Sequence, residues 1–155
     1  MLSYFYLVLL GGDIMHKSFF VLLALVFLLL CPIAEGADWK LYGRTADGCN
    51  YYYDASSVKT LSKGIKKVWT KTQADHDKCI LALIQMRTEH GHSIKGYENY
   101  SRTIELVKID CSSKITGIET STDYDNKGNV LDKVTSWDAT VPETFAYGLY
   151  EQICK

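Results

Sequence analysis

From residue 37 onward, short segments in which hydrophobic and polar residues alternate are separated by turn-forming residues. Alternation with a period of two is typical of a β-strand that buries one of its faces. Turn signals such as Asp47-Gly48 and Asp125-Asn126-Lys127-Gly128 stand between such segments. The pattern predicts an antiparallel β-sheet of about six strands, over residues 39–43, 51–53, 65–72, 100–111, 114–124 and 130–136.

Two segments depart from this alternation and predict helices. Residues 77–88 form an apolar cluster between the third and fourth predicted strands, although a short apolar run also fits a buried strand. Near the C-terminus, Pro142 suits the first position of a helix, and Phe145, Leu149 and Ile153 recur every four residues. Such a stripe packs on a sheet. The predicted fold class is therefore α+β, an antiparallel sheet with a C-terminal helix packed on it.

The first 36 residues differ in composition from the rest of the chain. Met15-His16-Lys17 gives a basic start, residues 19–30 are apolar, and small residues lead to Gly36. This order predicts a secretory signal peptide over residues 15–36, with cleavage after Gly36. A membrane-spanning helix needs roughly 20 apolar residues, and this run is shorter and ends at Cys31-Pro32. The mature chain is expected to leave the cytoplasm, for the periplasm or the cell surface of a bacterium.

Two alternatives concern the same region. Residues 1–14 are interpreted as translated leader sequence upstream of a true start at Met15, since Gly11-Gly12-Asp13 is encoded by purine-rich codons like those of a bacterial ribosome-binding site. A lipid on Cys31 would anchor the chain to a membrane, but Leu30 precedes it where lipoprotein processing favours a small residue. Contact with a membrane is thus expected only through the signal peptide or, less favoured, through that lipid.

The predicted mature chain, residues 37–155, is long enough for one domain with a single core. It carries 16 Lys plus Arg against 16 Asp plus Glu. A neutral domain lacks the basic surface that nucleic-acid binding requires, so nucleic acid is excluded as a partner.

The mature chain retains four cysteines: Cys49, Cys79, Cys111 and Cys154. An even number in an exported chain predicts two disulfides, and three connectivities are possible. A Cys111–Cys154 bridge would close a loop whose closure stabilises the fold by about 3–4 kcal/mol on the chain-entropy estimate. A metal site made of cysteines is disfavoured because no CxxC pair is present.

The chain resembles the surface-adhesin protein E domain family of bacterial exported proteins. The similarity is carried by the order and spacing of residues 39–41, 51–54, 57–58, 68–69, 108–111, 124–130 and 149–154, together with Trp137 and Pro142. The resemblance implies an antiparallel sheet of about six strands with a C-terminal helix, over residues 37–155, and favours a Cys111–Cys154 bridge. Cys49, Cys79 and residues 74–97 depart from the family pattern. They predict a helical insertion between the third and fourth strands, tied to the sheet by a Cys49–Cys79 bridge.

One set of residues predicts a binding surface. In a strand Tyr52 points away from Tyr51 and Tyr53, and Lys67 and Lys71 share a face with Trp69. Tyrosine and tryptophan give large contact surfaces at little entropic cost. The alternative is that the lysines only protect a strand edge. The aromatic residues would then build the core, with Trp39, Tyr51, Tyr53 and Tyr147 as candidates.

The histidines predict a second, competing function. His76, His90 and His92, with Asp77, lie in or beside the predicted insertion and are residue types that hold zinc or copper. A helix between them would separate His76 from His90 by about 20 Å. No linear catalytic motif is present. The two hypotheses are an exported non-enzymatic module without a cofactor, contacting a protein or polymer of the envelope or exterior, and a periplasmic metal-binding protein.

Overall fold

The computed structural model describes residues 36–135 and 143–155, and Ala37–Lys155 form one compact unit. The predicted leader (residues 1–14), nearly all of the predicted signal peptide, Cys31, Trp137 and Pro142 lie outside the described residues. The strands are β1 (Trp39–Arg44), β2 (Cys49–Asp54), β3 (Lys59–Ser62), β4 (Ile65–Ala74), β5 (Tyr100–Asp110), β6 (Ile115–Asp125) and β7 (Val130–Val134). The helices are α3 (Asp77–Glu89), α4 (Glu143–Cys154) and the short 3₁₀ turns η1 (Ala55–Ser57) and η2 (Tyr97–Asn99).

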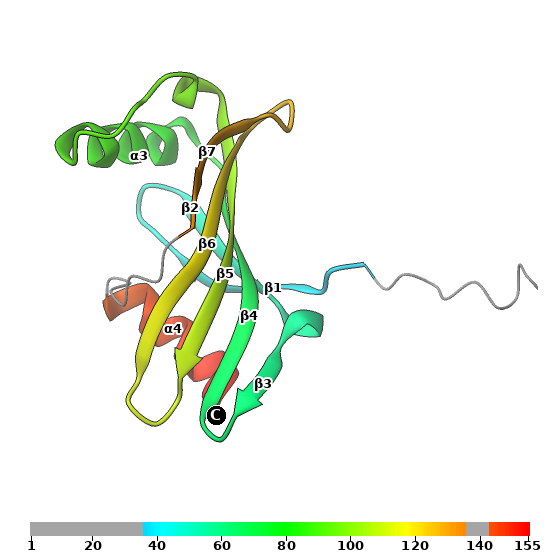
Figure 1. Ribbon diagram of the computed structural model, residues 1–155. Helices are drawn as coiled ribbons and strands as arrows, with labels where there is room; N and C mark the ends of the chain where they lie inside the picture. The colour runs from blue at the N-terminus through cyan, green and yellow to red at the C-terminus, as the bar shows by residue number, and fades with distance from the viewer. Residues whose placement is uncertain (1–35, 136–142) are drawn as a thin grey trace, which may run out of the picture. The chain divides into compact units, whose positions relative to one another are not determined.

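All seven strands form one antiparallel sheet in the order β1-β2-β4-β5-β6-β7, and β3 also pairs with β4 (Figure 1). Along one edge of β4, β3 pairs with residues 65–67 and β2 with residues 70–74. Strand β5 pairs with residues 65–73 along the opposite edge of β4. Strand β3 is the one that the sequence does not predict. All four of its residues are exposed, so no alternation marks it.

Both helices lie on the same side of the sheet, which we call the inner face (Figure 1). Val68, Val107 and Ile109 project from β4 and β5 toward α4 and are buried there against Leu149 and Ile153. Each such side chain contributes about 1.5–3 kcal/mol when fully buried. The predicted stripe of the C-terminal helix is therefore confirmed for its last two members, while the side chain of Phe145 lies outside the described residues.

Covalent and polar contacts fix α4 at its C-terminal end. Cys154 is bonded to Cys111, directly after β5. The Lys66 ammonium donates a hydrogen bond of 2.6 Å to the Ile153 carbonyl, where a cation complements the negative end of the helix dipole. Lys66 thus belongs to the inner face, opposite Lys67 and Lys71.

Along the chain, helix α3 follows β4 and precedes β5, which are the strands predicted as third and fourth. Cys79 near its start is bonded to Cys49 at the start of β2. Both predicted bridges are thus confirmed: Cys111–Cys154, which the resemblance favours, and Cys49–Cys79, which was expected to tie the additional segment to the sheet. That residues 74–97 are an insertion relative to protein E stays a prediction. Among the described residues, no helix is long and apolar enough to cross a bilayer.

The far end of α3 is held by a buried polar network. Arg87 forms ion pairs with Asp123 of β6 (3.4 Å) and Asp132 of β7 (2.6 Å). Asp123 also accepts hydrogen bonds from the hydroxyls of Tyr97 and Thr103. The hydrogen bond from Arg87 holds the pKa of Asp132 below its ordinary value. Because buried polar groups are costly unless they are paired, this network defines one position for the end of the helix.

We expect Arg87→Leu to lower the free energy of unfolding by about 3 kcal/mol, because it leaves the buried Asp123 carboxylate without its cation. Arg102→Leu, which removes a partly exposed arginine from β5, is the matched control and should cost less than about 1 kcal/mol. Urea denaturation at pH 7 measures both losses. Equal losses for the two variants would contradict the structural role of the network.

Candidate functional site

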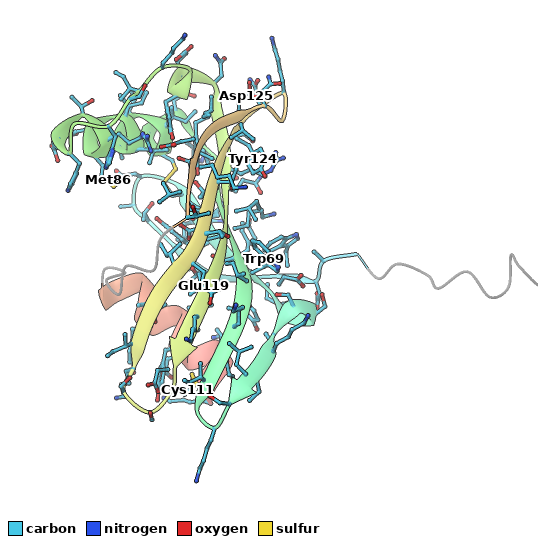
Figure 2. The ribbon with its side chains drawn as sticks, in the orientation of Figure 1. Trp69, Met86, Cys111, Glu119, Tyr124 and Asp125 are labelled. Atoms are coloured by element: carbon cyan, nitrogen blue, oxygen red, sulfur yellow. A yellow bond between two sulfur atoms is a disulfide. The ribbon has the colours of Figure 1, made fainter. Side chains whose placement is uncertain are left out.

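The face of the sheet opposite α3 and α4 carries a group of aromatic, cationic and apolar side chains, and we call it the outer face. Trp69 and Tyr124 project from it, away from the two helices (Figure 2). The register places ten of its residues: Trp39, Leu41, Tyr52, Lys67, Trp69, Lys71, Arg102, Ile104, Leu106 and Tyr124. All four sequence-predicted binding residues are among them.

Lys71 lies at the centre of this group. It pairs with Tyr52 on β2 and with Ile104 on β5. Its ammonium lies 4.6 Å from the Tyr52 ring centroid and 4.9 Å from that of Trp39. An ammonium at this distance from an aromatic face is attracted by the ring quadrupole. The two rings therefore fix the position of the charge.

A second cation with an aromatic partner lies next to the first. Arg102 pairs directly with Tyr124 on β6, and its guanidinium lies 4.8 Å from that ring centroid. On β5 Arg102 lies two residues before Ile104, which makes it a diagonal neighbour of Lys71. Burial lowers the pKa of Lys71, and the positive charge of Arg102 lowers it further. Among the described residues, no carboxylate forms an ion pair with either cation.

Lys67 and Trp69 occupy the same face with different surroundings. The Lys67 ammonium forms an ion pair of 2.5 Å with Glu119 on β6. Trp69 is 39% exposed, and its backbone N–H donates a hydrogen bond of 3.0 Å to the Ser57 hydroxyl. Lys67 is thus neutralised within the fold, whereas Lys71 is not. Of the two predicted lysines, Lys71 is the one available to an anion.

The core assignment of two aromatic residues was wrong. Trp39 lies on the outer face over Lys71, and Tyr147 on α4 is 57% exposed. Tyr53 does pack against the core, as expected. Sequence reasoning also missed Arg102 and Tyr124. The sequence indicated only that each of them lies in a predicted strand. It did not indicate that they pair, because the register that pairs them depends on a bulge.

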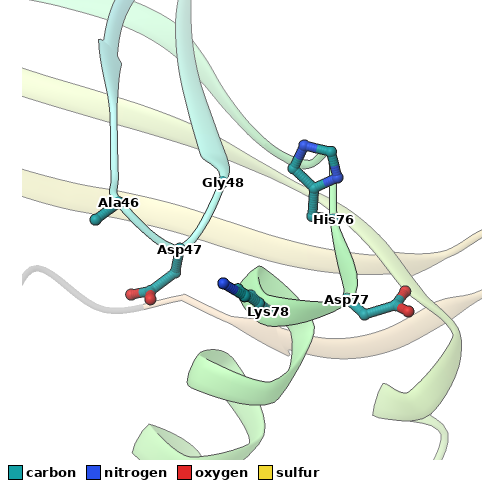
Figure 3. A pocket seen from close by; sticks show the side chains of 6 residues that line it. All are labelled: Ala46, Asp47, Gly48, His76, Asp77 and Lys78. Carbon is teal, nitrogen blue, oxygen red and sulfur yellow. The ribbon is translucent and has the colours of Figure 1, made fainter.

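The predicted metal ligands are not brought together. His76 immediately precedes α3, and the pocket beside it shows the His76 ring and the Asp77 carboxylate pointing apart (Figure 3). His90 and His92 stack at the other end of the helix, with ring centroids 6.5 Å apart. Thirteen helical residues separate the two ends, a length of about 20 Å. Among the described residues, no group of three or more His, Cys, Asp or Glu side chains is placed to hold a metal ion.

Comparison with known proteins gives one similarity in structure. No family model matches the sequence, and no curated protein does. A solved structure of the selenomethionine form of Haemophilus influenzae protein E is similar, with 13% identity and a TM-score of 0.47. The similarity covers 79% of this chain and 90% of that one. The likeness to that structure is one of fold alone.

The electrostatic effect of Arg102 on Lys71 can be tested by measuring the pKa of Lys71. Arg102→Gln removes the neighbouring positive charge, so we expect the pKa of Lys71 to rise toward its ordinary value. Because burial is the larger cause of the lowering, the recovery is partial. NMR titration of the lysine Cε–H signals measures the pKa. Lys114→Gln, in an exposed turn beside α4, is the control and should leave the pKa of Lys71 unchanged. An unchanged value in Arg102→Gln would show that the two charges do not interact.

Proposed function

We propose that this protein is an exported, non-enzymatic binding module that holds an acidic polymer of the cell envelope or exterior on its outer face. One observation carries the proposal. Lys71 and Arg102 are neighbouring cations, each against an aromatic ring, and among the described residues neither has a carboxylate partner. Neighbouring cations that no carboxylate of the fold neutralises favour an anionic ligand.

The chemistry of the surface matches repeating acidic units. Lysine and arginine donate charge-assisted hydrogen bonds to carboxylate or sulfate groups. Trp39, Tyr52, Trp69 and Tyr124 offer flat apolar faces beside these donors, and such faces contact the apolar side of a ring or chain. Leu41, which is exposed, and Ile104 extend this apolar area. A polymer with an anionic group and an apolar face in each unit fits this combination.

The site is rigid before any ligand arrives. Lys71 lies in the interior of β4, with paired strands on both sides. A ligand therefore pays little of the usual cost of ordering the surface that it binds. Catalysis is not part of the proposal, because the outer-face set contains no nucleophile with an adjacent base.

Export is supported by two kinds of observation. The predicted signal peptide over residues 15–36 and the resemblance to an exported surface-adhesin family point to the periplasm or the cell surface. Two disulfides in the described chain fit an oxidising compartment. The domain that acts there is residues 37–155.

Heparin, alginate and poly-glutamate serve as probes of the outer face. The test uses whichever of the three polymers binds the unmodified protein most tightly. We expect the double variant Lys71→Gln with Arg102→Gln to weaken its binding by at least about tenfold, the equivalent of 1.4 kcal/mol. Lys63→Gln with Lys114→Gln removes the same net charge from exposed turn positions, so it is the matched control. Isothermal titration calorimetry at two salt concentrations measures the affinities. Equal weakening in both double variants would reduce the effect to net charge and contradict the proposal.

The aromatic part of the site is tested separately. Trp39→Ala keeps every charge of the outer face but removes one ring from Lys71. We expect about a two- to thirteenfold loss of affinity for the same probe, because one ring contact contributes about 0.5–1.5 kcal/mol. Tyr147→Ala, which removes an exposed ring from α4, is the control. Full affinity in Trp39→Ala would show that the outer face acts by charge alone.

A further inference from the structure

A cleft of about 390 Å³ lies on the inner face of the sheet, beneath α3. This volume falls in the range of small-molecule sites, about 300–1,000 Å³. Ala82, Leu83 and Met86 of α3 form one wall, and Ile118 of β6 contributes from the sheet. The Cys49–Cys79 bridge joins the two walls at one end. The cleft is therefore separate from the outer face, on the other side of the same strands.

The charged residues that line the cleft are acidic. Glu105 of β5 lines it and accepts hydrogen bonds from the hydroxyls of Ser121 (3.2 Å) and Thr70 (3.4 Å). Asp47 also lines it, while the described lining contains no Lys, Arg or His. Burial raises the pKa of Glu105, and the charge of Asp123 raises it further. The carboxylate of Glu105 is thus destabilised in the fold and has no cationic partner among the described residues.

Three tyrosines line the cleft together with Glu105. Tyr42, Tyr51 and Tyr100 all line the cleft, and the ring centroids of Tyr42 and Tyr51 lie 6.1 Å apart. Burial raises the pKa of each phenol, and the negative charge of Glu105 raises it further. Aromatic rings around a negative group attract an organic cation through their π faces. Their hydroxyls stay protonated at neutral pH.

We propose that this cleft binds a small amphiphilic amine, with its apolar body against Leu83 and Met86 and its ammonium group between Glu105 and the tyrosine rings. A cation offsets the cost of the buried carboxylate, because removing an ion pair partner from a buried site is strongly unfavourable. A ligand with a carboxylate would meet Glu105 and Asp47 as like charges. A neutral ligand of the same shape gains the apolar contacts but leaves Glu105 without a counter-ion.

The unmodified, oxidised protein gives the first test, with three probes that share one apolar body. They are 4-phenylbutylamine, 4-phenylbutanol and 5-phenylpentanoate, each with four methylenes between the ring and the polar group. We expect the amine to bind at least about tenfold more tightly than the alcohol, a difference of 1.4 kcal/mol, and the carboxylate to bind most weakly. Shifts of the Met86 and Ile118 methyl signals report occupancy of the cleft. An alcohol that binds as tightly as the amine, or methyl signals that no probe shifts, would overturn the proposal.

Two variants locate the binding. Glu105→Gln should reduce the affinity for the amine about tenfold while leaving the alcohol unchanged, and Glu119→Gln on the outer face is the control with the same chemical change. If Glu105→Gln does not fold, Ala82→Leu fills the cleft from α3 and should abolish the shifts for all three probes. Undiminished amine binding in a folded variant of either kind would overturn the proposal. Glu105→Gln and Ala82→Leu both change the inner side of the sheet, so polyanion binding on the outer face should be unchanged in these two variants.

Discussion

The arrangement of both faces depends on the hydrogen bonding of β4 along its two edges. Strand β5 covers one edge, and β2 with β3 covers the other. Because side chains alternate along a strand, a shift of one residue would exchange the two faces. Val68 would then leave the core, and Lys71 and Trp69 would enter it. Pairing on both sides thus fixes the core and the candidate binding surface in one step.

The alternation of side chains between the two faces separates acidic from basic residues, although their charges sum to zero over residues 37–155. The inner face holds Glu105, Asp123 and Asp132, and Arg87 forms ion pairs with the last two but not with Glu105. The outer face holds Lys71 and Arg102, with Lys67 neutralised by Glu119. A domain with equal numbers of acidic and basic residues can therefore offer a cationic surface and an acidic cleft, back to back. Net charge excludes a bulk electrostatic partner, but it says nothing about either site.

The sequence predicts those elements whose pattern of apolar and polar residues follows the period of a strand or a helix. Strands β4, β5 and β6 and helix α3 lie within two residues of their predicted bounds. Strand β3 was missed because Lys59–Ser62 has no buried position. The predicted faces of Tyr52, Lys67 and Lys71 agree with the register, since period two alone decides them.

What the sequence could not supply is the pairing between strands. Trp39 was assigned to the core because a large aromatic residue is usually buried, yet β1 is an edge strand whose pairing with β2 places it over Lys71. Arg102 meets Tyr124 only because the β5–β6 register shifts at a bulge between Leu106 and Val107. Such shifts follow from tertiary packing and leave no mark in the local pattern. The acidic cleft was not predicted for the same reason, because its tyrosines come from three different strands.

The way in which α3 is held explains why a cleft persists beneath it. A helix with a continuous apolar stripe would settle onto the sheet and fill the space. Here Leu81 and Met86 remain 63% and 49% exposed, so the helix buries little of its apolar surface. Its contacts are concentrated at its ends, where Cys79 is bonded to Cys49 and Arg87 joins the acidic network. A helix fixed at two ends spans the sheet without collapsing onto it. The Cys49–Cys79 disulfide therefore does more than add stability, because together with Arg87 it holds α3 above the cleft that Glu105 lines.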